Sequence, residues 1–217
     1  MRATAYTVRT RNAISSRDKD YNRIKNDLYC RLVNTQRGGD RLEQLPRRSW
    51  MDLSVICYFK DEAGREIRPV TYEDLTNWGV DEERLFSDAR KNTAENGAMV
   101  FTRLDHFLRS LGDCGGQEEI GEGLPLYLLT NRERTLGAVC VTYGQMLAGI
   151  ADRLSSSFYV LPSSIHECLI LRDDGSCDPE ELNRLVQAIN NSYVADAEIL
   201  SDHVYYYDRP SGAVRMS

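Results

Sequence analysis

The 217-residue sequence lacks any apolar run long enough for a membrane-spanning helix. One of its longest apolar stretches, residues 137–143, is far shorter than the roughly 20 residues that cross a bilayer. Residues 1–20 also lack the apolar core of a signal peptide, because arginines and polar residues interrupt them. These absences predict a cytoplasmic protein with no attachment to a membrane.

The six cysteines show no CxxC spacing, so we expect no structural zinc site of the usual kind. A disulfide framework suits small secreted chains, and several of these cysteines lie in apolar runs where the thiol acts as a small hydrophobic group. The sequence also lacks GxxxxGK[ST], GxGxxG and HExxH motifs. We therefore expect reduced, mostly structural cysteines and no cofactor.

The net charge of −6 is unevenly distributed. Residues 1–50 contain 12 basic and five acidic side chains, and the remainder contains 15 basic and 28 acidic ones. A basic segment can bind nucleic acid or an acidic partner. Because this segment has no stacking motif and the rest of the chain is acidic, we expect a solvated surface and no nucleic-acid partner; a steep salt dependence of DNA or RNA binding would indicate otherwise.

Hydrophobic residues at 41% and charged residues at 28% are typical of a globular domain with a buried core. Apolar periodicity predicts helices and strands in irregular succession. The predicted helices cover residues 20–36, 81–94, 99–111, 144–155 and 178–193. The predicted strands cover residues 51–60, 65–70, 126–130, 136–142, 158–161, 166–172, 203–208 and 213–216.

Hairpins mixed with helices indicate an α+β fold, with a largely antiparallel sheet and helices packed mainly on one face. We expect residues 1–19 to be a disordered or remnant segment and residues 20–217 to form a single domain. Residues 112–123 are rich in glycine and acidic, which predicts a mobile loop.

Two polar strings near the C-terminus concentrate the side chains that could perform chemistry, and both lie at predicted strand ends. The first string is residues 162–167 (PSSIHE) and the second is residues 201–208 (SDHVYYYD). If the two strands were neighbours in a suitable register, both histidines could face one pocket. The candidate site residues are Ser163, Ser164, His166, Glu167, Asp202 and His203.

Three chemistries would fit these residues. A serine could act as nucleophile with a histidine and Asp202, although the GxSxG elbow is absent. Cys168 could act with His166, but that histidine lies two residues away on the same strand. His166, His203 and Asp202 have the side chains of a metal site without a recognised spacing.

A structural interpretation of the two strings is favoured over these chemistries. Two serines after a proline commonly bond nearby backbone N–H groups in turns, and three successive tyrosines can place one ring in the core and the others at its rim. We therefore expect a polar network that fastens two strand ends together.

Several blocks of sequence resemble a bacterial family, the domain of unknown function numbered 5688, which is common in gut Clostridia. The blocks are 158–167 (FYVLPSSIHE), 201–208 (SDHVYYYD), 126–131 (LYLLTN) with Gly137-Ala138, 31–34 (RLVN), 45–48 (LPRR), Asp52-Leu53 and 77–80 (NWGV). The resemblance covers about residues 20–209. It departs at Cys168, where the family has an apolar residue, and at the N-terminus, where members usually have a longer region with its own helix and strands.

The resemblance implies an N-terminally shortened member of an uncharacterised family. A missing strand would leave a sheet edge open to a second copy of the chain or to a protein partner. We expect a non-enzymatic binding module, and the alternative is a hydrolase that uses Ser163, Ser164, His166, Asp202 and His203. The hydrolase hypothesis requires His166 and His203 to reach a common cavity, with a serine or aspartate near an imidazole nitrogen. The binding-module hypothesis does not require this arrangement.

Overall fold

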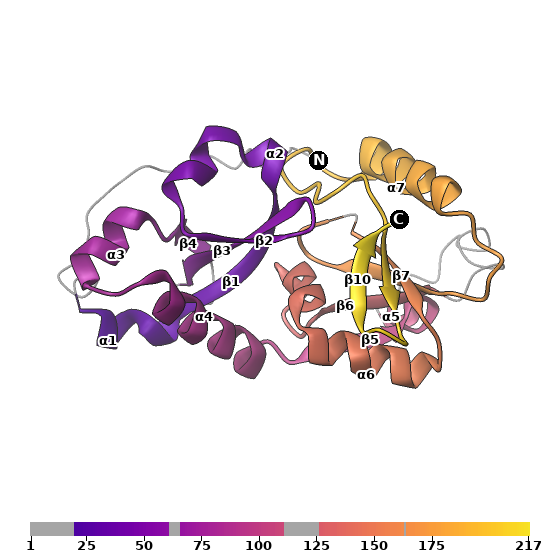
Figure 1. Ribbon diagram of the computed structural model, residues 1–217, viewed down its shortest axis with the longest axis horizontal. Coiled ribbons are helices and arrows are strands. Elements are labelled where there is room, and N and C mark those ends of the chain that lie inside the picture. The colour runs from indigo at the N-terminus through magenta and orange to yellow at the C-terminus, as the bar shows by residue number, and fades with distance from the viewer. Residues whose placement is uncertain (1–19, 61–65, 111–125, 163) are drawn as a thin grey trace.

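The chain forms two antiparallel sheets, which a computed structural model describes over residues 20–60, 66–110, 126–162 and 164–217. Figure 1 shows an elongated molecule, with the N-terminal sheet in one half and the C-terminal sheet in the other. The predicted N-terminal segment 1–19, the predicted loop 112–123 and Ser163 lie outside the described residues. The α+β class with antiparallel pairing is confirmed.

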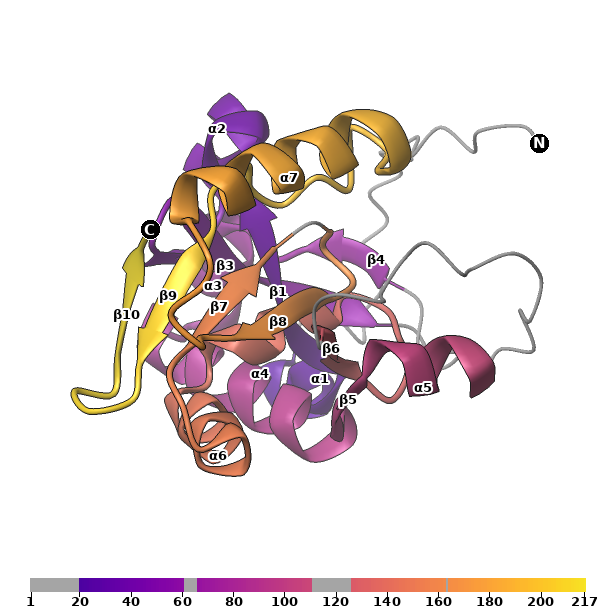
Figure 2. The same ribbon diagram turned by 90° about the vertical axis from the view of Figure 1, so that its right-hand side faces the viewer.

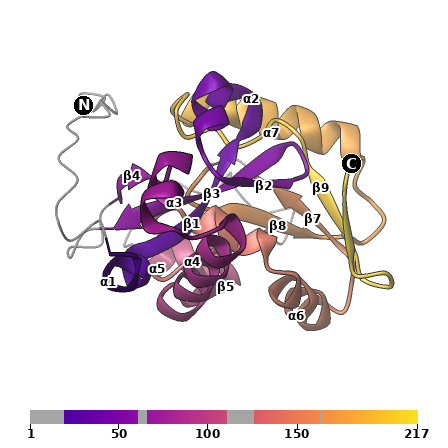
Figure 3. The same cartoon turned by 60° about the vertical axis from the view of Figure 1, so that its left-hand side comes forward.

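The N-terminal sheet is built around β3 (Leu53–Lys60), whose residues are almost all buried. β1 (Leu28–Asn34) pairs with one side of β3, and β2 (Arg47–Trp50) and β4 (Glu66–Pro69) pair with the other. The helical segments around it are α1 (Tyr21–Ile24), η2 (Lys25–Asp27), α2 (Thr35–Gly38), η3 (Gly39–Gln44), α3 (Tyr72–Trp78) and α4 (Glu82–Asn96). Figure 3 brings this half forward, with α2 above the sheet and α4 below it.

The outer edge of β1 is covered by α4. The Cys30 N–H donates to Thr93 Oγ1 at 2.8 Å, and Asn92 Nδ2 donates to the Leu28 carbonyl at 2.9 Å. Side chains of a helix thus satisfy backbone groups that an edge strand would otherwise expose.

The C-terminal sheet has the order β10-β9-β7-β8-β6-β5. Its strands are β5 (Met99–Arg103), β6 (Leu126–Asn131), β7 (Phe158–Leu161), β8 (Cys168–Arg172), β9 (Tyr205–Asp208) and β10 (Ala213–Met216). Its helical segments are α5 (Leu104–Ser110), η4 (Gly137–Thr142), α6 (Gly144–Leu154) and α7 (Pro179–Tyr193).

The C-terminal sheet has a helix on each face, whereas the sequence pattern predicts helices mainly on one face. In β7, Phe158 and Val160 pack in the same core cluster as the α6 residues Leu147 and Ile150. Tyr159 and Leu161, which point to the other face, pack with the α7 residues Leu182 and Val186. Figure 2 shows α7 and α6 on opposite sides of this sheet. All four β7 residues are buried, because helices cover both faces of the sheet at this strand. Its sequence therefore shows no alternation of apolar and polar residues.

One core cluster joins the two halves. It contains Leu32 and Leu85 from the N-terminal half and Leu129 and Tyr205 from the C-terminal half. None of the described helices is both long and apolar enough to cross a membrane.

Most predicted elements are present. The helices predicted at 81–94 and 178–193 begin with aspartate caps: Asp81 accepts the Arg84 N–H at 2.8 Å, and Asp178, which precedes Pro179, accepts the Glu180 N–H at 3.0 Å. The predicted hairpins 51–70 and 203–216 are confirmed by the pairing of β3 with β4 and of β9 with β10.

Three predicted elements are wrong. The predicted helix at 20–36 is a single helical turn followed by β1, because Leu28 and Leu32 fit a period of two with Cys30 as well as a helical period. The predicted helix at 99–111 begins with β5 and becomes α5 only at Leu104.

The predicted strand at 136–142 is the 3₁₀ segment η4. β6 already pairs with β5 and β8, so neither of its edges is free for a hairpin partner. The chain turns instead at Leu136, whose φ is 55°.

Candidate functional site

The two polar strings lie side by side where the halves of the molecule meet. The Ile165 N–H donates to the Glu198 carbonyl at 2.9 Å, and the Ser201 N–H donates to the Pro162 carbonyl at 3.2 Å. An isolated antiparallel bridge joins Ser164 to Ile199 between these two bonds. The start of the second string and the residues before it therefore run antiparallel to the first.

Asp52 of the N-terminal half receives the second string. It lies in the turn between β2 and β3 and accepts hydrogen bonds from Ser201 Oγ at 2.8 Å, from His203 Nδ1 at 3.1 Å and from the Tyr205 hydroxyl. Burial alone would raise the pKa of Asp52, but the bonds from Tyr205, His203 and Ser201 outweigh burial and hold this pKa below its usual range. Asp52, Ser201, His203 and Tyr205 are called the Asp52 cluster.

Tyr205, like Ser201, has no exposed surface. Burial, and then the hydrogen bond to Asp52, raise the pKa of its hydroxyl well above the usual range, so the phenol stays protonated and donates. The Trp50 ring packs edge-on against the Tyr205 ring with centroids 4.9 Å apart. This tyrosine therefore joins the apolar core and the polar cluster.

Two asparagines bind the backbone where the second string begins. Asn34, at the end of β1, donates to the Leu200 carbonyl at 2.9 Å. Asn190 of α7 donates to the Ser201 carbonyl at 3.0 Å and to Asp202 Oδ1 at 2.8 Å. The predicted site residue Asp202 thus binds a helix side chain, whereas Asp52 takes the position beside His203.

His166 occupies a different environment from His203. Its Nδ1 accepts the Leu136 N–H at 3.2 Å, and its Nε2 lies 3.6 Å from Glu198 Oε1. Its carbonyl accepts from Thr130 Oγ1 at 2.8 Å. A Cβ added at Gly137 would lie 2.4 Å from that Oγ1 and 2.8 Å from the His166 carbonyl, so only glycine fits there.

Ser164 and Ser201, the two serines of the strings that the structure describes, form hydrogen bonds with carboxylates and with backbone N–H groups. Ser164 Oγ donates to Glu167 Oε1 at 2.7 Å and accepts the His166 N–H at 3.0 Å. Ser201 Oγ accepts the His203 N–H at 3.0 Å in the same way. Within the described residues, no serine hydroxyl is hydrogen-bonded to an imidazole nitrogen.

The two imidazoles also have separate partners, Asp52 for His203 and Leu136 with Glu198 for His166. Over the ranges that the structure describes, no group of three or more His, Cys, Asp or Glu residues is placed to hold a metal ion. Cys168 is fully buried, and burial raises the pKa of its thiol well above the usual range. The described side chains of the two strings therefore bind carboxylates, a helix side chain and backbone groups at the junction.

A groove of about 640 Å³ opens beside the junction. Its walls come from β1, from α2 and η3, and from the turn that precedes the second string. Its floor is apolar and includes a small buried cluster of Val33, Leu42, Leu45 and Ile56. Its charged lining residues are Arg31, Arg37, Arg41, Asp196 and Glu198. We call it the arginine groove.

A family model described as a family of unknown function (DUF5688) matches residues 2–209 of the chain. The chain belongs to this family. No curated protein and no solved structure matches it. The family blocks seen in the sequence form the junction: Asn34 and Asp52 come from blocks of the N-terminal half, and the two strings come from the C-terminal half.

Residue patterns alone did not single out Asp52, Asn34 or the three arginines. Asp52 is one of 33 acidic residues, and it is 149 positions away from Ser201 in the sequence. The available signal was its place in a family block that also contains Leu53. For Arg37 and Arg41 the only signal was the basic charge of residues 1–50, whereas Arg31 also belongs to the family block 31–34.

Proposed function

We propose that this protein is a non-enzymatic binding module whose arginine groove receives an acidic peptide segment of a partner protein. The observation that supports it is the combination of an apolar floor with three arginines at one groove. A volume of about 640 Å³ lies in the usual range of ligand sites, roughly 300–1,000 Å³.

Arginine suits this role because its planar guanidinium binds a carboxylate through two parallel hydrogen bonds. Arg37 and Arg41 are exposed, and neither has an ion-pair partner among the described residues. Asp196 and Glu198 line the opposite wall, so the groove carries both charges and a defined orientation for a bound segment. The apolar floor would take a hydrophobic side chain between the acidic ones.

The test is fluorescence anisotropy with labelled dodecapeptide libraries that have a fixed Glu-Leu-Glu-Leu centre. We expect saturable binding that weakens with salt, and at least 10-fold weaker binding by the double variant Arg37→Ala/Arg41→Ala. The matched control is Arg132→Ala/Arg172→Ala, which removes two exposed arginines outside the groove and should change affinity less than about 2-fold.

A library with a Lys-Leu-Lys-Leu centre distinguishes recognition of negative charge from nonspecific hydrophobic binding. Equal binding of the two libraries, or equal loss of affinity in the groove and control variants, would contradict the proposal.

A hydrolase remains the alternative role for Ser163, Ser164, His166, Asp202 and His203, with less support from the geometry. Its test is a hydrolase panel with His166→Ala and His203→Ala, because lost turnover with unchanged folding would favour catalysis. Loss of stability in these variants would favour the structural role.

Self-association through a sheet edge is a further prediction. β10 (Ala213–Met216) is the terminal strand of its sheet, and three of its four residues are exposed. Light scattering at high protein concentration tests it, and a monomer under those conditions would count against it.

A further inference from the structure

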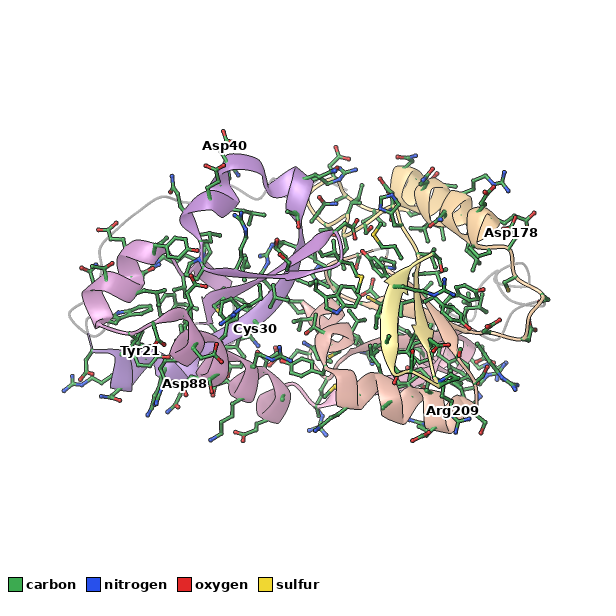
Figure 4. All side chains as sticks on the ribbon, in the orientation of Figure 1. Tyr21, Cys30, Asp40, Asp88, Asp178 and Arg209 are labelled. Carbon is green, nitrogen blue, oxygen red and sulfur yellow. The ribbon has the colours of Figure 1, made fainter. Side chains whose placement is uncertain are left out.

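Cys30 and Cys57 lie directly opposite each other on the paired strands β1 and β3. Both are free thiols and each is only 1% exposed. Figure 4 labels Cys30 in the N-terminal half, between the sheet and α4. Because directly opposed residues of an antiparallel pair project from the same face, the two thiols are neighbours in the core.

The backbone hydrogen bonds identify this pair as a non-hydrogen-bonded pair of the sheet. The Cys30 N–H donates away from β3, to Thr93 Oγ1 at 2.8 Å. The Cys57 carbonyl points away from β1 and accepts the Val70 N–H at 2.9 Å. Opposed residues of this kind have Cα atoms about 4.5 Å apart, the closer of the two antiparallel spacings.

That spacing lies within the range of about 4.4–6.8 Å over which a disulfide can form. The two side chains project from the same face of the sheet at directly paired positions, which makes the thiols neighbours. The remaining described cysteines lie on other elements: Cys140 in η4, Cys168 in β8, and Cys177 before α7. Of the cysteines that the structure describes, these two are the ones directly paired across strands.

We propose that Cys30 and Cys57 form a dithiol that closes to a cross-strand disulfide under oxidation by a peroxide. One thiolate attacks a peroxide oxygen, breaks the O–O bond and becomes a sulfenic acid, and hydroxide leaves. The second thiolate attacks that sulfur and displaces hydroxide, so two electrons pass to the peroxide and the two thiol protons end in water. The bond ties β1 to the central strand of its sheet.

Burial makes the reaction slow in the closed fold. It raises the pKa of the Cys57 thiol, and the neighbouring Cys30 side chain raises this pKa further, so little thiolate is present. The two cysteines therefore stay as thiols under reducing conditions, and they react with peroxide when β1 separates briefly from α4. The inference does not depend on the arginine groove, although Arg31 and Val33 of β1 line that groove.

The test is an equilibrium measurement, so its result does not depend on how fast an oxidant reaches the buried thiols. The full chain is unfolded in urea, reduced, refolded in mixtures of oxidised and reduced dithiothreitol, and alkylated. Trypsin then releases residues 26–31 and 49–60, which hold the two cysteines. We expect these peptides to be the dominant linked pair, with an equilibrium constant at least about 30-fold higher in the folded chain than in urea.

The proposal is overturned if the folded chain keeps Cys30 and Cys57 alkylated in mixtures that already oxidise it in urea, or if another cysteine pair dominates. Cys30→Ala should abolish the linked peptides, whereas the matched variant Cys140→Ala, which also removes a buried thiol, should retain them. Mass spectrometry of the native protein after peroxide treatment should show a loss of two hydrogens. Higher oxidation of Cys30 and Cys57 without the link would contradict the proposal.

Discussion

The Asp52 cluster and the arginine groove lie close together, yet they use polar side chains in opposite ways. In the cluster, a half-buried carboxylate accepts from three side chains. In the groove, Arg37 and Arg41 are exposed and have no ion-pair partner among the described residues. Polar groups that are hydrogen-bonded to one another stabilise a fold, whereas exposed charges over an apolar floor are suited to a ligand.

Removal of the central carboxylate should have the largest effect. Asp52→Ala deprives three donors of their acceptor and leaves the Tyr205 hydroxyl buried without its partner, so we expect a loss of about 3 kcal/mol in the free energy of unfolding. Urea denaturation measures it. Asp40→Ala, which removes an exposed aspartate of η3, should change stability by less than about 0.5 kcal/mol. Similar losses in the two variants would contradict a structural role for Asp52.

The His166 end of the junction should be sensitive to one methyl group. Gly137→Ala places a Cβ 2.6 Å from the Asn131 nitrogen, as well as close to Thr130 and His166, and we expect a loss of about 2 kcal/mol. The matched control is Gly149→Ala in α6, where the added Cβ meets nothing within 4 Å. That change should stabilise the protein by about 0.5–1 kcal/mol through helix propensity. A tolerated Gly137→Ala would show that this contact can relax.

Acid should weaken the Asp52 cluster selectively. The folded pKa of Asp52 lies below its unfolded value of about 3.9, so its contribution is fully present above that value and is lost as the pH falls through the folded pKa. We expect the stability difference between the wild type and Asp52→Asn to narrow between pH 6 and pH 3, by urea denaturation at both values. A constant difference would mean that the charge of Asp52 contributes little.

The groove arginines should contribute least to stability. Arg37→Ala/Arg41→Ala should leave the free energy of unfolding within about 0.5 kcal/mol of wild type, because both side chains are exposed. Thermal or urea unfolding in parallel with the peptide-binding measurement separates the two properties. A large loss of stability would show that these arginines, like the Asp52 cluster, contribute to folding, and it would contradict this prediction.

Local signals in the sequence were sufficient for much of the fold. The predicted ranges 51–60, 81–94 and 178–193 match β3, α4 and α7, because an apolar run without polar breaks forms β3 and an aspartate caps each helix. The local signals failed at Leu28 and Leu32, where a spacing of four fits both a helix and a strand. They also failed at 136–142, because the partners that occupy both edges of β6 come from distant parts of the chain.

The candidate site was predicted less completely. The two strings were found because their polar residues stand at strand ends, and the structural network expected of them matches the contacts of Ser164, Ser201 and Asp202. The decisive partner, Asp52, could not be selected, since a contact across 149 positions depends on how the two halves pack. The sequence predicted that His166 and His203 could face one pocket, whereas in the structure the two imidazoles have different partners.

The most direct test of the junction is a double-mutant cycle between Asp52→Asn and Tyr205→Phe, measured by urea denaturation. If Asp52 holds the second string through this hydroxyl, the two changes should be coupled by about 1–2 kcal/mol. Asp52→Asn with Gly137→Ala serves as the control pair, because Gly137 contacts the His166 end, and it should be additive. Additivity of Asp52→Asn and Tyr205→Phe to within about 0.5 kcal/mol would contradict the role of Asp52 as the fastening point of the two halves.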